Sequence, residues 1–275
     1  MHLLAEQGHD VTVGSRGKTA VSFPNNVRRI KLDRANKDSM AAALQNTHWD
    51  IVYDQICFYA DDAASAVEVL ARKTARYVLC SSAAVYTRPL DAGEDAFDPS
   101  AYAIRIVERS SSSYAEGKRQ AEAVIFQRAG FPAVAVRFPI ILGPDDHTKR
   151  VRVQVARIAG NEPVNIENPE AEISLISSSE AAAFLAWLSG VPHTGPFNAC
   201  SDGPVALKTI VGFIEEATGK TATVNRQPET DSFSIFAKPF SATLNTGKAR
   251  QAGFQFQQTR DWLQPLIRNA GNGAN

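Results

Sequence analysis

Short apolar runs alternate with longer amphipathic segments through the first half of the chain. The runs at 11–13, 27–32, 50–54, 77–80 and 133–138 are rich in Val, Ile, Leu or Tyr, which is typical of short buried strands. The segments 39–44, 62–72 and 113–128 place apolar residues at helical spacing, and 1–8 predicts a helix closed by Gly8. Strands that alternate with helices in this way predict an α/β fold, with a doubly wound parallel sheet.

The second half is less regular, and the alternation ends after Gly143 and Pro144. The segment 207–218 predicts an amphipathic helix, and 261–268 a closing helix in which Pro265 is tolerated only in the early part. We therefore predict a sheet domain over 1–142 and a smaller C-terminal lobe over 143–275, with 171–200 returning to the sheet.

Composition narrows the class of protein. Of 275 residues, 44% are hydrophobic and 21% charged, which excludes a disordered or fibrous chain. Lys plus Arg and Asp plus Glu both total 29, so nucleic-acid binding is not expected from net charge, although a local basic patch is compatible with it. The three widely spaced Cys predict free thiols in a reducing compartment.

The chain shows neither a membrane-spanning run nor a secretion signal. No stretch reaches the roughly 18 apolar residues that a membrane span needs. The N-terminus lacks the basic, apolar and small-residue regions of a signal peptide. A cytoplasmic location is therefore expected.

The clearest chemical signal is Tyr114 and Lys118, four residues apart in a predicted helix. This spacing places the phenol and the ammonium on one helical face. A neighbouring positive charge favours the phenolate, so Tyr114 can titrate below its ordinary pKa of about 10 and act as an acid or base on an alcohol/carbonyl pair. The alternative is a surface Tyr-Lys pair without catalytic meaning.

Ser81 and Ser82 follow a predicted strand, upstream of the Tyr-Lys helix. A hydroxyl at the carboxyl end of a parallel strand points into the ligand crevice, where Ser82 can hydrogen-bond the reacting oxygen. In the alternative interpretation, both serines only cap a helix or form a turn.

The chain resembles the extended short-chain dehydrogenases/reductases, the NAD-dependent epimerase/dehydratase family. The resemblance rests on the segment 77–86, the Tyr114/Lys118 helix, Arg137-Phe138-Pro139 with Gly143-Pro144, the segment 195–198 and the segment 245–249. Within the family, 14–18 and 143–150 look closest to the branch with chloroplast stem-loop RNA-binding proteins and bacterial reductase-like and epimerase-like proteins. A Rossmann-like dinucleotide-binding domain is thus expected over 1–142.

The resemblance implies particular roles for individual residues. Ser82, Tyr114 and Lys118 match the catalytic triad, and Lys118 also holds the nicotinamide ribose. The other residues expected at the cofactor are Ser15, Arg16, Lys18, Asp33, Arg34, Gln55, Ser81, Phe138 and Pro139. Tyr86 and Arg150, with Ser82, are expected to bind the substrate, and no metal site is expected.

The cofactor would be NAD or NADP. Arg16 stands where NAD-binding members often carry an acidic residue, so Arg16 with Lys18 would suit the 2′-phosphate of NADP. The alternative is that both are solvated loop charges.

Two features depart from the family pattern. The family's first strand and its glycine-rich turn normally precede a segment like 2–9, so that strand and its phosphate-binding turn are expected to be missing from this sequence. The segment 173–180 also lacks the Arg with which nucleotide-sugar epimerases hold a diphosphate, although Lys149, Arg150 and Arg152 could replace it.

Three hypotheses follow. The first is an NAD(P)-dependent oxidoreductase or epimerase that acts on a hydroxyl/carbonyl substrate, such as a sugar derivative. The second is a non-catalytic family member that binds RNA or a protein partner, and the third is a truncated form with impaired cofactor binding. A homodimer is expected only by analogy, because the Tyr-Lys helix often lies near a dimer interface in this family.

Overall fold

The computed structural model describes residues 1–19, 21–105 and 112–272. It divides into two compact units. The first comprises Met1–Thr87, Glu94–Phe138 and Ala182–Asn198, and the second comprises Arg88–Gly93, Pro139–Ala181 and Ala199–Asn275. The first unit thus ends at Phe138 before it resumes with 182–198. The domain boundaries at 142 and the return of 171–200 to the sheet stay predictions.

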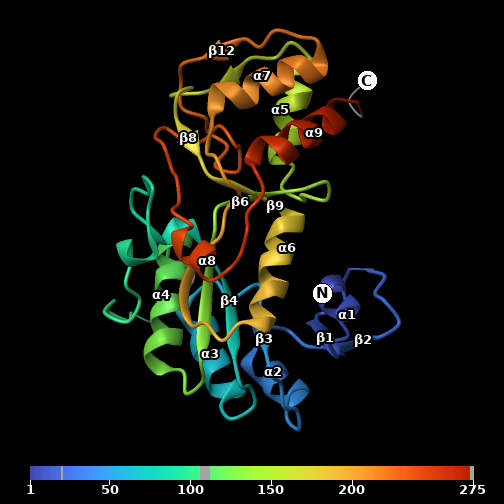
Figure 1. The fold of residues 1–275 in the computed structure, drawn as a ribbon, viewed down its shortest axis with the longest axis vertical. Coiled ribbons are helices and arrows are strands. Elements are labelled where there is room, and N and C mark those ends of the chain that lie inside the picture. Colours follow the sequence, from blue (N-terminus) through green and yellow to red (C-terminus); the bar gives the residue numbers. More distant parts are fainter. Residues whose placement is uncertain (20, 106–111, 273–275) are drawn as a thin grey trace. The chain divides into compact units, whose positions relative to one another are not determined.

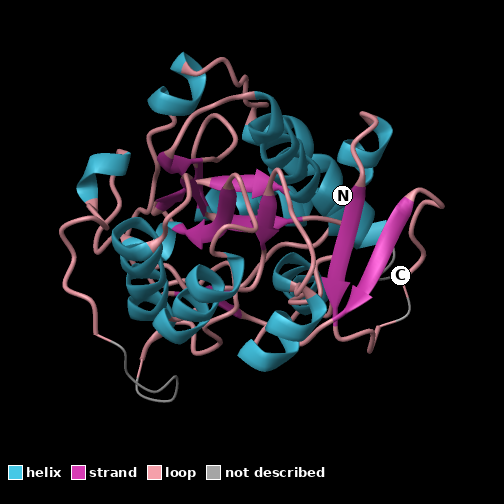
Figure 2. Cartoon of the chain, turned by 90° about the horizontal axis from the view of Figure 1, so that it is seen from below, coloured by secondary structure: helices cyan, strands magenta, loops and turns pink. Residues whose placement is uncertain are grey.

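The first unit contains a four-stranded parallel sheet in the order β10-β5-β4-β3, of which β3 and β4 are labelled in Figure 1. Its strands are β3 (Val52–Asp54), β4 (Tyr77–Ser82), β5 (Ala133–Phe138) and β10 (Gly195–Asn198). β4 and β5 pair from Tyr77 with Ala133 to Ser82 with Phe138. Helices accompany the strands (Figure 2), and the predicted α/β fold with parallel strands is confirmed.

A second parallel sheet in this unit consists of β1 (Val11–Ser15) and β2 (Val27–Lys31). Matched in chain order to the classic doubly wound order 3-2-1-4-5-6, β1 and β2 correspond to strands 2 and 3, and β3, β4 and β5 correspond to strands 4, 5 and 6. None of the described residues forms a strand in position 1. Thr12 Oγ1 on β1 and Tyr53 OH on β3 are buried hydroxyls without a hydrogen-bond partner in the described structure.

The helices of the first unit are α1 (His2–Glu6), α2 (Lys37–Ala43), α3 (Ala60–Leu70) and α4 (Tyr114–Arg128). α3 and α4 pack against the sheet with an apolar core that includes Ala63, Ala66, Tyr77, Leu79, Val124 and Ile125. From Gly117 to Ile125, every α4 residue except Arg119 is buried within the chain. This part of α4 therefore exposes little surface for a partner subunit. A dimer contact through the helix stays a prediction.

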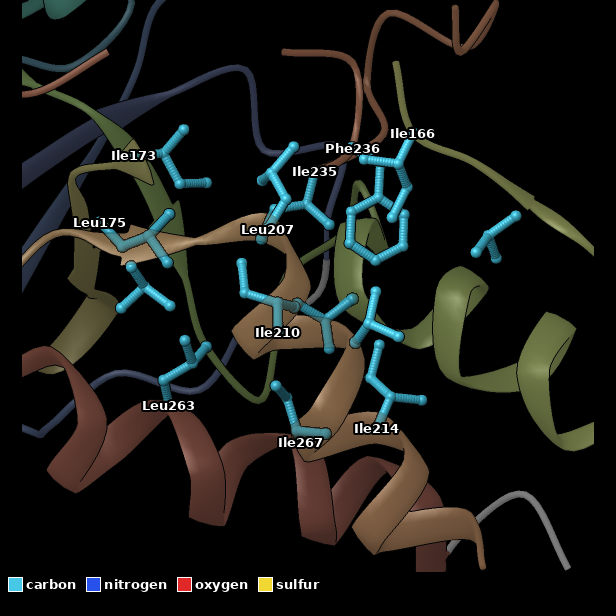
Figure 3. Packing of buried hydrophobic residues seen from close by; sticks show 14 of the residues in the cluster. Ile166, Ile173, Leu175, Leu207, Ile210, Ile214, Ile235, Phe236, Leu263 and Ile267 are labelled. Carbon is cyan, nitrogen blue, oxygen red and sulfur yellow. The ribbon is translucent and has the colours of Figure 1, made fainter. Parts of the chain in front are cut away.

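The second unit surrounds its own apolar core (Figure 3). Its helices are α5 (Arg150–Ala159), α7 (Leu207–Thr218), α8 (Gly247–Gln251) and α9 (Thr259–Asn272), and α6 (Ser178–Trp187) begins in this unit and continues into the first. Three two-stranded sheets pair β6 (Ile140–Leu142) with β9 (Leu175–Ser177), β7 (Val164–Asn165) with β12 (Val224–Asn225), and β8 (Glu172–Ile173) with β11 (Val205–Ala206).

The closing helix differs from the sequence-based expectation. Pro265 is the seventh residue of α9, so the helix continues through a proline that was expected only near its start. Leu263 and Ile267, on either side of it, are fully buried in the same apolar core as Ile210 and Ile214 of α7 (Figure 3). The free energy gained by burying this apolar face offsets the loss of the backbone hydrogen bond that proline cannot donate.

No helix within the described residues is long and apolar enough to cross a membrane.

Candidate active site

Helix α4 positions the Tyr-Lys pair. Ser113 is its N-cap, and the Ser113 hydroxyl accepts a hydrogen bond from the Glu116 amide. Tyr114, the first helical residue, is 49% exposed, whereas Lys118, one turn later, is 1% exposed. The pair therefore presents a phenol to solvent and keeps its cation inside the protein.

The Lys118 ammonium is enclosed by polar and aromatic groups. Its Nζ donates to the carbonyl oxygen of Cys80 at 2.6 Å and to that of Cys57 at 2.9 Å. It also lies 4.6 Å from the ring centre of Phe58 and 5.9 Å from that of Tyr114. Burial lowers the pKa of Lys118, although nearby thiols and carboxylates oppose this effect.

Ser82 ends β4 and caps the short 3₁₀ turn Ala83–Val85, where its hydroxyl accepts a hydrogen bond from the Ala84 amide. Helix α4 holds this segment from both sides. Lys118 binds the Cys80 carbonyl, and Arg119 Nε donates to the Val85 carbonyl at 2.7 Å. The helix that carries Tyr114 thus fixes the backbone on which Ser82 lies.

A buried ion pair lies one turn further along α4. Arg137 Nη2 and Glu122 Oε2 are 2.7 Å apart, and both side chains are completely buried. Glu122 counteracts the effect of burial, and the pKa of Arg137 is raised. Arg137 also donates to the carbonyl oxygens of Glu94 and Phe97, so the pair fixes the segment after Ser82 to the sheet.

Two residues that were expected to contact the cofactor or the substrate take part in this network. The Ser81 hydroxyl donates to Glu122, and Ser81 is buried. The Tyr86 hydroxyl accepts from Arg137 at 2.9 Å and donates to Asn198 Oδ1 at 2.7 Å. Ser81 and Tyr86 thus make internal contacts in this structure, and their contacts with cofactor and substrate stay predictions.

Arg34, also expected at the cofactor, makes internal contacts as well. Its Nε lies 2.6 Å from Asp54 Oδ2, and its Nη2 donates to the Asp62 carbonyl. Tyr77 also donates to Asp54, at 2.6 Å. Arg34 is therefore locked in a buried ion pair, whereas the half-buried neighbour Asp33 remains a candidate for the adenine end.

The other candidate cofactor residues of the first unit have diverse surroundings. Ser15 is half-buried at the end of β1, and Arg16 and Lys18 are exposed in the following loop. Gln55 is exposed and accepts a hydrogen bond from the Cys80 thiol. The side chains of Arg16 and Lys18 are thus accessible to a ligand.

Phe138 ends β5 and is buried against Phe184, with ring centres 6.4 Å apart. Pro139 and Arg150 belong to the second unit. There, Arg150 Nη1 donates to the Phe233 carbonyl at 2.8 Å, and its guanidinium lies 5.5 Å from the centre of the Phe233 ring.

The three cysteines are free thiols. Cys57 and Cys200 are buried and Cys80 is half-buried, and burial raises the pKa of each thiol to about 12. The described residues contain no group of three or more His, Cys, Asp or Glu that could hold a metal ion.

Sequence reasoning missed several residues that shape the site, above all Phe58, Gly117 and Glu122. Glu122 could have been found, because Tyr114, Lys118 and Glu122 follow one another at four-residue spacing on one helical face. Phe58 carries no such signal, because its contact with Lys118 depends on the tertiary structure.

Solved structures share this fold. A UDP-glucuronic acid 4-epimerase from Bacillus cereus in complex with NAD matches with a TM-score of 0.73, at 16% sequence identity over 99% of this chain and 92% of that one. A UDP-glucose 4-epimerase from Thermus thermophilus in complex with NAD matches with a TM-score of 0.71, at 16% identity over 99% and 93% of the two chains. At these identities the similarity establishes the fold.

Sequence comparisons identify the family. The chloroplast stem-loop binding protein of 41 kDa b from Arabidopsis thaliana is 26% identical over 201 residues, which are 66% of this chain. The match spans only 50% of that protein's length. The model of the NAD dependent epimerase/dehydratase family matches residues 1–181. The chain therefore belongs to the NAD dependent epimerase/dehydratase family.

Proposed function

We propose that the protein is an NAD(P)-dependent oxidoreductase or epimerase that acts on a hydroxyl-bearing carbon of a sugar derivative. The observation that carries this proposal is the placement of Tyr114 and Lys118 on one face of α4, whose next turn binds the segment that carries Ser82. Membership of the family supports it, as does the likeness to two sugar-nucleotide epimerases.

Each of the three residues has a distinct task in the proposed reaction. The exposed phenol of Tyr114 takes the proton from the substrate hydroxyl or returns it to the carbonyl. The buried ammonium of Lys118 stabilises the phenolate by its charge. Ser82 orients the reacting oxygen from the end of β4.

A nicotinamide dinucleotide fits some of the residues present. Asp33 would contact the adenine, Phe138 and Pro139 would lie along the nicotinamide, and Arg16 with Lys18 would favour a 2′-phosphate. When bound, the cofactor accepts or returns the hydride. The described residues contain no glycine-rich turn at a helix N-terminus, the usual site for the pyrophosphate of such a cofactor.

The proposal is tested by incubation of the protein with NAD and either UDP-glucose or UDP-glucuronic acid, the sugars named for its structural neighbours. Net oxidation of the sugar should produce the absorbance of reduced nicotinamide, and oxidation followed by return of the hydride should produce an epimerised sugar. The absence of both signals, with these sugars and with a panel of simpler sugar alcohols, would contradict the proposed activity.

Cofactor binding needs a separate titration. NADH and NADPH should be titrated into residues 1–275 and into a version that carries additional upstream residues. We expect tighter binding by the longer version if those residues supply a strand in position 1 and its phosphate-binding turn. A preference for NADPH that Arg16→Glu reverses would support the role of Arg16.

RNA binding is a second candidate, because the matched relative is named as a stem-loop binding protein. The zero net charge offers no general attraction for phosphates. Retention of an RNA stem-loop that weakens steeply with salt would favour this candidate, and retention on an immobilised nicotinamide cofactor would favour the enzyme.

A further inference from the structure

Phe58 lies against both members of the proposed catalytic pair. Its ring centre is 4.6 Å from Lys118 Nζ and 6.2 Å from the ring centre of Tyr114. The first distance is within the roughly 6 Å over which an aromatic face attracts a cation. Phe58 therefore contacts the ammonium and the phenol ring at the same time.

Lys118 has three N–H groups to satisfy. Two serve the carbonyl oxygens of Cys57 and Cys80. With both carbonyls engaged, the face of Phe58 is available to the remaining side of the ammonium. Two carbonyl dipoles and an aromatic face thus compensate the desolvation of a cation that is 1% exposed.

The backbone around Phe58 also has hydrogen bonds that do not involve Lys118. The amides of Phe58 and Tyr59 both donate to Asp62 Oδ2, at 2.9 and 3.1 Å, as part of the N-terminal cap of α3. The ring is thus held from α3, and Lys118 and Tyr114 approach it from α4.

Gly117 allows this approach. A Cβ at position 117 would lie 2.6 Å from Cδ1 of Tyr59 and 2.8 Å from the carbonyl oxygen of Phe58. Real Cβ atoms essentially never come so close to another atom, and one of the two neighbours is backbone. Any side chain at 117 must therefore push α4 and the Phe58 segment apart.

We propose that Phe58 is a positioning residue, which seats the Lys118 ammonium beside Tyr114, and that Gly117 permits the close packing that this seat requires. The inference rests on the proposed role of Tyr114 and Lys118. It adds Phe58, in the segment between β3 and α3, to the residues that set the titration midpoint of the Tyr114 phenol.

The test is an ultraviolet titration of the Tyr114 phenol in the full chain, isolated as the difference between each protein and the same protein with Tyr114→Phe. We expect Phe58→Leu to move the midpoint upwards by about half a pH unit or more, because the cation is less firmly held beside the phenolate. Phe58→Tyr, which keeps an aromatic face, should retain the wild-type midpoint.

An unchanged midpoint in Phe58→Leu overturns the proposal, and so does an equal shift in Phe58→Leu and Phe58→Tyr, since that would indicate packing alone. If Phe58→Leu does not fold, Gly117→Ala decides. It should raise the midpoint, whereas Gly130→Ala, with no atom within 4 Å of the added Cβ, should not. Equal midpoints in these two variants also overturn the proposal.

A parallel NADH titration separates this inference from the proposed function. A wild-type protein that binds no NADH argues against the function, but it leaves the midpoints of the Phe58 variants interpretable. A wild-type protein that binds NADH, with no shift in Phe58→Leu, argues against the role of Phe58 alone.

Discussion

Helices α4 and α7 are of similar length, but α7 buries only apolar residues, whereas α4 buries charged and polar residues as well. α7 turns Leu207, Ile210, Val211 and Ile214 towards the apolar core of the second unit, while Lys208 in its first turn is exposed and pairs with Glu170. α4 buries Lys118, Gln120 and Glu122 together with alanines and valine. Burial of apolar surface stabilises α7, whereas α4 is stabilised by apolar burial and also by specific polar partners.

The difference shows where a fold can place chemistry. Apolar burial is nondirectional, so α7 tolerates small shifts without losing its stabilisation. A buried charge is stable only in one geometry, because its desolvation must be matched by particular hydrogen bonds. α4 therefore combines stability with accurate placement of Tyr114.

The largest expected effect comes from the buried pair of α4. Arg137→Met should lower the free energy of unfolding by about 3–5 kcal/mol, because it leaves the Glu122 carboxylate buried without its cation. Lys208→Met, which removes the exposed pair with Glu170, should change it by less than about 1 kcal/mol. Urea unfolding measures both, and similar small losses in the two variants would refute the contrast.

Truncation in α7 should have a somewhat smaller effect and leave the site intact. Ile210→Ala removes a completely buried side chain and should cost about 2–5 kcal/mol. Thermal or urea unfolding reports the loss. The midpoint of the Tyr114 titration should stay at the wild-type value, and a shift there would show that the two helices are not independent.

Interior glycines allow a closely matched comparison. Gly212→Ala in α7 adds a Cβ with nothing within 4 Å and should stabilise the protein by about 0.5–1 kcal/mol, since alanine favours helix. Gly117→Ala in α4 should instead destabilise it by about 1–3 kcal/mol through the clash with the Phe58 segment. Changes of the same sign in the two unfolding free energies would contradict the packing described here.

The smallest effect concerns pH. Burial lowers the pKa of Lys118 in the folded protein, so between that value and the unfolded pKa of about 10.4 the unfolded chain binds more protons. Stability contributed by this residue therefore rises with pH through that window. The free energy of unfolding of the wild type, minus that of Lys118→Met, should therefore increase as the pH approaches about 10. A decrease of this quantity would show that the pKa of Lys118 is shifted in the opposite direction.

The sequence predicts features that depend on local spacing. The parallel strands and the placement of Tyr114 and Lys118 on one helix face follow from periodicity and from a four-residue separation. Helix α5 escaped prediction because Val151, Val153 and Val155 alternate as in a strand, although Val153 is exposed in the structure. Local pattern therefore predicts most of the elements around the site.

The partners of buried polar groups were beyond sequence reasoning. Ser81 binds Glu122, 41 residues away, and Tyr86 binds Asn198, 112 residues away. Arg34 binds Asp54, 20 residues away. A polar residue beside a strand end looks the same in sequence whether it faces a ligand or such a partner, so the sequence could not reveal these three internal contacts.

The most direct test of the account is the rate of hydride transfer between NAD and an accepted sugar substrate in Tyr114→Phe. Tyr102→Phe is the matched control, because it removes a phenol that binds Glu116 on the same helix. The account predicts a loss of about 10²–10⁴-fold in Tyr114→Phe and a near wild-type rate in the control. A Tyr114→Phe protein that retains the full rate would contradict the assignment of Tyr114 as the proton-exchanging residue.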